Sequence, residues 1–145
     1  MLTVIEKVAA LQNVEVFTDV PTEQLAYLAA VAEEVDCEAN YEIYSENDAA
    51  DSFYLLLDGT VRLHQGSQEI TTAKPMDTFG IWALFDEEPR VVTATTLTPA
   101  KLLRIDRERF VDILADHVQI SQGILKNLSS KLRNLLGRVQ FSSGS

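Results

Sequence analysis

The strongest constraint on the fold is the alternation of short strand-like runs with turn residues between residues 36 and 105. Seven or eight such runs are rich in β-branched and aromatic residues. Regular turns between short strands favour a sandwich, jelly roll or barrel over a parallel sheet. The clearest runs lie at 36–39, 42–45, 53–57, 60–64, 68–73, 91–97 and 100–105.

Two turns in this region contain glycine. Asp58-Gly59 separates two strand-like runs, and this dipeptide is typical of a type I′ hairpin, in which both central residues have positive φ. The pattern therefore predicts that 53–57 and 60–64 form one hairpin. Gly66-Ser67 predicts a second turn, which leads into 68–73.

Both ends of the chain have helical periodicity. The spacing predicts a helix over 2–12 and a second helix that begins at Pro21, since proline prefers the first turn. Asp106 is expected to cap a helix over 107–115 through its carboxylate, and a longer helix is predicted over 118–139. The apolar face of the second helix is predicted to contain Leu25, Leu28, Ala29, Ala32 and Val35.

These elements predict a single domain over 1–140. Its parts are N-terminal helices at 1–35, a β-roll at 36–105 and C-terminal helices at 106–140, followed by a flexible tail at 141–145.

The last predicted helix carries a row of apolar residues at spacings of three and four. Two interpretations remain open: the row packs on the chain's own barrel, or it forms a homodimer interface. Ile124 and Leu136 widen the row. Its members are Leu125, Leu128, Leu132, Leu135 and Val139, of which the first four are the candidate interface.

Charge and composition exclude several classes of function. The net charge of −10 makes nucleic acid an unfavourable partner, although residues from 118 onward contain four bases and no acid. No apolar run is long enough to span a membrane, and we expect no signal peptide. Because Cys37 is the only cysteine, no intramolecular disulfide can form, which fits a cytoplasmic protein. Cys37 itself is expected to be a small buried apolar residue.

Catalytic and metal-binding patterns are also missing. His64 and His117 are isolated and form no metal-ligand spacing, and the haem or iron–sulfur ligands of a redox sensor are absent. No Ser–His–acid or Gly-x-Ser-x-Gly arrangement occurs. We therefore expect no enzyme activity, no metal and no obligatory cofactor.

One segment suggests a binding function, namely the Phe-Gly turn, short helical turn and Pro-Arg pair between Phe79 and Ala94. Amide groups at a helix start can bind an anion. An arginine ten residues after the turn can supply a second, forked contact.

This segment resembles the phosphate-binding cassette of the cyclic nucleotide-binding domain family, the sensory fold of catabolite-activator proteins and of kinase regulatory subunits. Val16-Phe17, Val20-Pro21, Glu46-Asn-Asp48 and 54–61 extend the resemblance over most of the chain. It implies a mainly β fold, an eight-stranded antiparallel jelly-roll barrel (double-stranded β-helix) with flanking helices. It also implies cyclic AMP (cAMP) or cyclic GMP (cGMP) as ligand. The implied binding residues are Phe79, Gly80, Ile81, Trp82, Ala83, Leu84, Pro89, Arg90, Val91 and Val92.

The cassette departs from the binding members of this family at several positions. Ile81 replaces the glutamate that accepts the ribose 2′-hydroxyl, and Val91 and Val92 replace two small residues and are expected to intrude into the pocket. Losing the ribose contact costs about 1–3 kcal/mol and overfilling about 1–3 kcal/mol more, or roughly 30-fold to 10⁴-fold in affinity. Two glycines are also missing: Asn47, beside one lost position, can still reach positive φ, whereas Met76 reaches it less easily.

These departures predict a regulatory or interaction module of a larger protein with impaired or absent cAMP and cGMP binding. Its partner would be another protein or a covalently linked output domain, and the DNA-reading helix-turn-helix of the transcription-factor branch is expected to be missing. The alternative is a sensor that binds a cyclic nucleotide, or another small phosphate ligand, through Arg90 and the amides near Gly80. Arg90 could instead pair with a carboxylate at 86–88, and Trp82 could stack on a base or pack against the protein.

Overall fold

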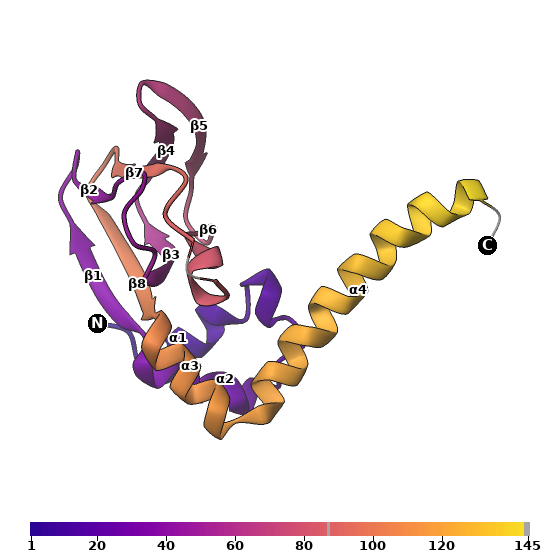
Figure 1. Ribbon diagram of the computed structural model, residues 1–145. Helices are drawn as coiled ribbons and strands as arrows, with labels where there is room; N and C mark the ends of the chain where they lie inside the picture. The colour runs from indigo at the N-terminus through magenta and orange to yellow at the C-terminus, as the bar shows by residue number, and fades with distance from the viewer. Residues whose placement is uncertain (87, 144–145) are drawn as a thin grey trace.

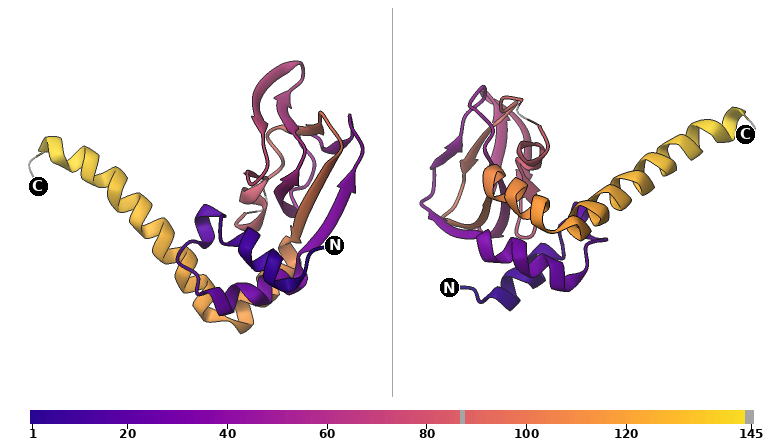
Figure 2. Two further views of the ribbon diagram at one scale, coloured as in Figure 1. Left: turned by 180° about the vertical axis from the view of Figure 1, so that it is seen from behind. Right: turned by 60° about the horizontal axis from the view of Figure 1, so that its bottom comes forward.

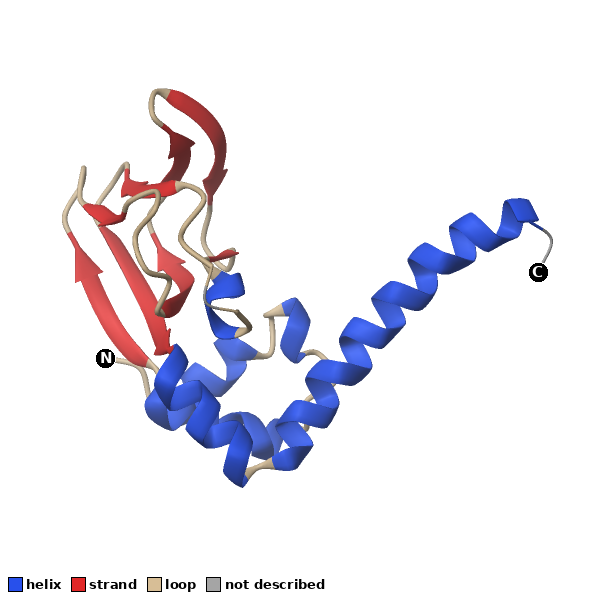
Figure 3. Ribbon diagram, in the orientation of Figure 1, coloured by secondary structure: helices blue, strands red, loops and turns tan. Residues whose placement is uncertain are grey.

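The computed structural model describes residues 1–86 and 88–143. Helices lie at both ends of the chain and strands in the middle (Figures 1 and 3). The helical elements are α1 (Val4–Leu11), η1 (Glu15–Phe17), α2 (Thr22–Val31), η2 (Ile81–Leu84), α3 (Arg107–Asp116) and α4 (Val118–Ser143). The strands are β1 (Glu33–Cys37), β2 (Glu42–Tyr44), β3 (Ser52–Asp58), β4 (Val61–Gln65), β5 (Gln68–Ala73), β6 (Thr78–Phe79), β7 (Thr93–Thr96) and β8 (Ala100–Asp106).

The strands form two four-stranded antiparallel sheets with the orders β1-β8-β3-β6 and β2-β7-β4-β5. This confirms the predicted mainly β fold with eight antiparallel strands and flanking helices. In the part of the chain that the structure describes, no strand pairing joins the two sheets. The arrangement is therefore a jelly-roll sandwich, and the closed barrel that was expected is not observed.

The connection at Gly59 differs from the prediction. β3 and β4 lie in different sheets, so Asp58-Gly59 carries the chain between sheets and the predicted hairpin was wrong. Only Gly59 of this pair has positive φ, at 95°, which excludes a type I′ turn. A Cβ atom at Gly59 would lie 2.4 Å from the carbonyl oxygen of Pro99. Glycine is therefore needed here for a close approach as well as for its φ.

The second glycine turn is confirmed. β4 and β5 pair with Gln65 opposite Gln68, so Gly66-Ser67 forms a two-residue hairpin loop. Gly66 has φ 57°, as the first central residue of such a loop requires.

One predicted helix boundary and one predicted capping bond differ from the structure. The second helix ends at Val31, and Val35 lies in β1 opposite Leu102 rather than on a helix face. Pairing with β8 overrides the helical spacing there, because β-branched valine suits a strand. Asp106 does precede α3, but its side chain makes no capping bond. Its carboxylate accepts instead from Arg104, at 3.0 Å.

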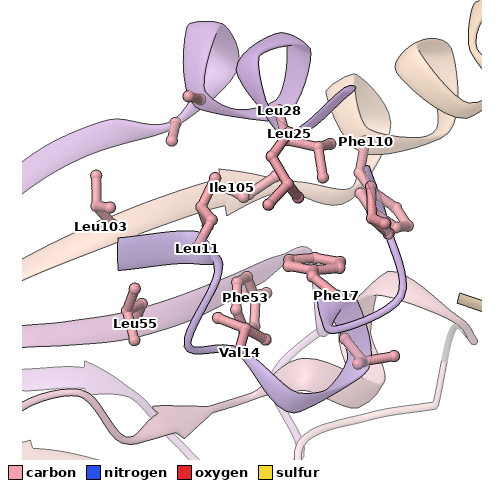
Figure 4. Packing of buried hydrophobic residues seen from close by; sticks show 14 of the residues in the cluster. Leu11, Val14, Phe17, Leu25, Leu28, Phe53, Leu55, Leu103, Ile105 and Phe110 are labelled. Carbon is pink, nitrogen blue, oxygen red and sulfur yellow. The ribbon is translucent and has the colours of Figure 1, made fainter. Parts of the chain in front are cut away.

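The core is divided by the β1-β8-β3-β6 sheet, because successive side chains of a strand point to opposite faces. Phe53 and Leu55 of β3 pack toward the helices, whereas Tyr54 and Leu56 pack toward the second sheet. Figure 4 shows the helix-side cluster, in which Phe17 meets Phe53 edge to face, with ring centroids 6.2 Å apart. Each face of β3 is therefore covered, which explains its continuous apolar sequence. Cys37 is half-buried beside the inter-sheet cluster, and burial raises the pKa of its thiol.

α4 extends away from the sheets in all three views (Figures 1 and 2). Its first turns are anchored by Ile120 and Ile124, which are buried in the helix-side core, and by an ion pair of Lys131 with Glu15 at 3.0 Å. Ile124 thus packs on the chain's own body. The leucine row is exposed: Leu125, Leu128, Leu132 and Leu135. Among the described residues, no helix is both long and apolar enough to cross a membrane.

The C-terminal end of α4 is longer than predicted. The helix reaches Ser143 and so includes the first three residues of the segment assigned to a flexible tail. The side chain of Val139, the last member of the predicted row, lies outside the described part of the structure.

Replacing Met76 by glycine is expected to raise the free energy of unfolding by about 0.5–1 kcal/mol. Met76 has φ 77° in a turn that the Asp77 amide closes on the Lys74 carbonyl at 2.9 Å. The left-handed conformation costs a residue with a side chain about 1–2 kcal/mol, and glycine removes this strain. Glycine also loses more conformational entropy on folding, which offsets about 0.5–1 kcal/mol of the gain. Urea denaturation measures the change. Leu97→Gly is the matched control, because Leu97 is exposed and has negative φ; it should lose stability. A loss in both variants would contradict the assignment of strain to Met76.

Candidate functional site

The cassette backbone turns sharply at Gly80, between β6 and η2. Gly80 has φ 74°, and its carbonyl accepts from the amide of Ala83 at 3.1 Å. The predicted helical turn at 81–85 is therefore a short 3-10 turn at Ile81–Leu84. Because the Ala83 amide is already bonded within this turn, fewer backbone amides are available to a ligand than the sequence suggested.

Arg90 lies in the segment between η2 and β7, and its side chain points into the protein. Its side chain is buried, with 6% of the residue exposed. Nη2 donates to the carbonyl of Ser52 at 2.7 Å, and Nη1 donates to the carbonyl of Gly80 at 3.3 Å. The guanidinium carbon lies 4.0 Å from the centroid of the Tyr44 ring, a cation–π contact. The guanidinium thus links the cassette to β3 and β2.

Gly80 is required by this arrangement. A Cβ atom there would lie 2.6 Å from Nη1 of Arg90 and 3.4 Å from the carbonyl of Ser52. Any larger residue would displace the guanidinium from the cassette turn. The Phe79-Gly80 pair therefore allows the turn and leaves space for the guanidinium of Arg90.

The backbone of Arg90 is fixed by the turn before β3. The Arg90 amide donates to the Asp48 carbonyl at 2.9 Å, and the Asn47 amide donates to the Arg90 carbonyl at 2.8 Å. Asn47 has φ 70°, as was expected of an asparagine beside a missing glycine. These paired bonds hold the position from which the side chain enters the core.

Arg90 has no carboxylate partner among the described residues. The alternative of an ion pair with Asp86 or Glu88 is therefore not observed, and Glu87 lies outside the described residues. Nε of Arg90 is buried and has no hydrogen-bond partner in the described part of the chain. The positive charge of this guanidinium is therefore buried with carbonyl and aromatic partners among the described residues.

Arg104 provides a contrast within the same fold. Together with Arg90 it lines a cavity of about 310 Å³. Arg104 is half-exposed and pairs with Asp106 at 3.0 Å, and its Nε donates to Ser52 Oγ at 3.0 Å. The charge of Arg104 is thus compensated by a carboxylate, whereas Arg90 has no such partner within residues 1–86 and 88–143.

The aromatic residues under Arg90 form a small cluster. The Tyr44 and Phe79 ring centroids lie 6.2 Å apart, and Tyr54 stacks on Phe79 at 5.3 Å. Burial raises the pKa of Tyr44 to about 12, against the opposing effect of Arg90, and burial also raises the pKa of Tyr54. Both phenols therefore stay neutral and cannot neutralise the arginine.

A cavity of about 510 Å³ opens beside Arg90, within the size range of small-molecule sites. Eight of the ten predicted cassette residues line it: Phe79, Gly80, Ile81, Ala83, Pro89, Arg90, Val91 and Val92. Leu84 does not line it, because its side chain packs in the helix-side core. The side chain of Trp82 lies outside the described residues, so neither interpretation of it is tested.

Four further lining residues were not predicted as site residues. Tyr44, Ala50, Leu63 and Thr78 come from β2, the turn before β3, β4 and β6. Only Tyr44 had a visible signal, as an aromatic residue in the second strand-like run. The remaining lining residues are Asp86 and Glu88, which belong to the acidic run noted in the sequence.

The two valines fill the cavity less than expected. Val91 is 69% exposed, and Val92 is partly buried against the inter-sheet cluster. The space beside Arg90 therefore persists. Ile81 lies on the cavity wall and packs partly on the helix-side core, and its side chain has no acceptor for a sugar hydroxyl.

The chemistry of this site is that of binding. A buried guanidinium can hold a phosphate or a carboxylate. Within the described ranges, no three His, Cys, Asp or Glu side chains converge to hold a metal ion. Arg90 can hold an anionic group in this cavity, whereas the side chain of Ile81 offers a ligand no hydrogen-bond acceptor.

Comparisons with known proteins agree with this geometry. Residues 34–117 match the model of the cyclic nucleotide-binding domain. The CRP-like cAMP-activated global transcriptional regulator of Mycobacterium tuberculosis is 28% identical over 123 residues, which cover 81% of this chain and 55% of the regulator. The cAMP-dependent protein kinase regulatory subunit of Dictyostelium discoideum is 29% identical over 114 residues, which cover 73% of this chain and 33% of the subunit. The chain thus spans about half and a third of the lengths of these two regulatory proteins.

Solved structures give the same result. The N-terminal domain of a transcriptional regulator from Streptomyces coelicolor A3(2) has a TM-score of 0.81 at 27% identity, covering 87% of this chain and 94% of that domain. A cyclic nucleotide-binding-like protein from Brucella abortus has a TM-score of 0.69 at 30% identity, covering 75% of this chain and 97% of that protein. The two-sheet fold, the cassette around Gly80 and Arg90, and a family match over more than half of the chain together show that this chain belongs to the cyclic nucleotide-binding domain family.

Proposed function

We propose that the chain is a non-enzymatic regulatory domain that binds a small anion at Arg90 and in which ordinary binding of cAMP and cGMP is impaired. The buried guanidinium carries this proposal, because it lines the cavity and has no carboxylate partner among the described residues. Burying an ion costs several kcal/mol unless it is compensated. An anionic ligand would supply that compensation.

The impairment is local to the sugar end of the pocket. Ile81 would leave a ribose hydroxyl without an acceptor, at a cost of about 1–3 kcal/mol. Nothing comparable affects the anion end, where Gly80 and Ser52 hold Arg90 in the cavity wall. The site therefore favours an anion over a nucleoside.

A second candidate function is that of an interaction module, and the exposed leucine row of α4 favours it. Such a row supports self-association or docking of a protein partner or linked output domain. Both functions can belong to one domain, because they use different surfaces.

Ile81→Glu is expected to raise the affinity for cAMP roughly 5-fold to 150-fold, as the restored acceptor recovers about 1–3 kcal/mol. Isothermal calorimetry with amide chemical shifts measures the gain. Circular dichroism checks that the variant is folded, since Ile81 also contributes to the helix-side core.

The gain should require Arg90. In the Ile81→Glu background, Arg90→Ala is expected to abolish cAMP binding. Arg62→Ala should leave it unchanged, because Arg62 pairs with Glu69 at 3.4 Å on the β4–β5 hairpin. A folded Ile81→Glu variant that does not bind cAMP at millimolar concentration would contradict the assignment of the impairment to Ile81.

A further inference from the structure

We infer that the ligand of the Arg90 cavity is an organic monoanion with an apolar body, such as an aromatic carboxylate. The inference rests on the proposed function, since it needs Arg90 to hold the anionic group. It adds the chemistry of the remainder of the ligand, which the family's sugar contact would otherwise specify.

Beside the polar residues Thr78, Asp86 and Glu88, the cavity lining contains a wall of apolar side chains. Leu63, Ile81, Ala83 and Val92 line it, and none of these side chains can accept or donate a hydrogen bond. Each hydroxyl of a sugar that met this wall without a partner would cost about 1–3 kcal/mol. An apolar body placed there instead gains from burial. The wall therefore selects against a ribose and for a hydrocarbon or aromatic ring.

The charges around the cavity favour one negative charge on the ligand. Among the lining residues that the structure describes, Arg90 is the only cation, and Asp86 and Glu88 are two exposed carboxylates. The single positive charge of Arg90 balances one negative charge on the ligand. A second negative charge would face the acidic side chains without a further cation, although solvent and salt weaken that repulsion.

The shape of the site accommodates a ring system. The lining includes the aromatic residues Tyr44 and Phe79, and aromatic rings pair favourably edge to face as well as stacked. The volume of about 510 Å³ is enough for a two-ring ligand, since drug-sized sites begin at about 300 Å³.

The test compares two monocarboxylates that have the same charge at pH 7 and differ in the rest of the molecule: 2-naphthoate and gluconate. We expect naphthoate to bind the wild-type chain at least tenfold more tightly than gluconate, as measured by calorimetry and by shifts of the Gly80 amide. Arg90→Ala should weaken naphthoate at least tenfold. Ile81→Glu should also weaken it, because a second carboxylate replaces apolar wall.

Two control variants separate this site from other surfaces. Arg62→Ala removes an arginine outside the cavity, and Leu132→Asp removes apolar surface on α4; both should leave naphthoate binding unchanged. Loss of naphthoate binding in Leu132→Asp alone would overturn the inference, because the probe would then be bound on the leucine row.

The outcomes also separate this inference from the proposed function. Gluconate binding as tightly as naphthoate in an Arg90-dependent manner would overturn the inference and leave the anion site standing. If neither acid binds while Ile81→Glu gains cAMP affinity through Arg90, the inference is likewise overturned and the anion site stands. If no anion binds to either the wild type or Ile81→Glu, both fail.

Discussion

Gly59→Ala is expected to lower the free energy of unfolding by about 2–6 kcal/mol, a large part of the stability of a small domain. Two costs add. The φ of 95° at Gly59 is strained for alanine by about 1–3 kcal/mol. The new Cβ atom would meet the Pro99 carbonyl at 2.4 Å and the Ala100 Cα at 2.9 Å, and such overpacking costs about 1–3 kcal/mol more.

Gly66→Ala is the matched control for this prediction. Gly66 also has positive φ, at 57°, but a Cβ atom there would meet nothing within 4 Å. It should lose only the conformational part, about 1–2 kcal/mol. Urea denaturation of both variants separates strain from clash, and equal losses would show that the approach of Gly59 to β8 does not constrain the fold.

The same glycine explains why part of the fold was predictable and part was not. Gly59 and Gly66 both lie in turns between strand-like runs, so the local sequence predicts a similar turn at each of them. What separates them is the contact of Gly59 with Pro99 and Ala100, about forty residues away. Strand existence follows from local pattern, whereas strand pairing depends on such distant contacts.

The candidate site likewise contains residues that local sequence predicts and residues that only the tertiary fold brings together. The cassette residues lie close together in the sequence, at 79–84 and 89–92, so their gathering around one cavity could be expected from local turns. Tyr44 and Leu63 come from separate strands of the second sheet, and only the tertiary fold brings them together. The partners of Arg90 illustrate this limit best, because a sequence shows carboxylates at 86–88 but does not show that the carbonyls of Ser52 and Gly80 accept its hydrogen bonds.

Leu132→Asp is expected to convert a dimeric domain into a folded monomer. The exposed row on α4 has the three-and-four spacing of a two-helix seam, and Leu132 lies in its middle with 58% of the residue exposed. We propose that a second copy of the chain covers it. In a symmetric dimer each substitution counts twice, and burying one leucine contributes about 1.5–3 kcal/mol. Self-association should therefore weaken by at least about a hundredfold.

Asn134→Asp provides the control, since it introduces the same residue with the same change of charge at an exposed position off the row. Sedimentation velocity over a range of concentrations should show a dimer for the wild type and for Asn134→Asp, and a monomer for Leu132→Asp. Circular dichroism verifies that α4 stays helical.

A wild-type chain that sediments as a monomer at every concentration would remove the self-association proposal and leave the row to a different protein partner. That result would not affect the Arg90 site, because Ile124 and the Lys131–Glu15 ion pair hold the base of α4 on the body through contacts that do not involve the leucine row. The proposals for the two surfaces can therefore be tested separately. A domain with both surfaces would couple anion binding in the cavity to assembly through α4.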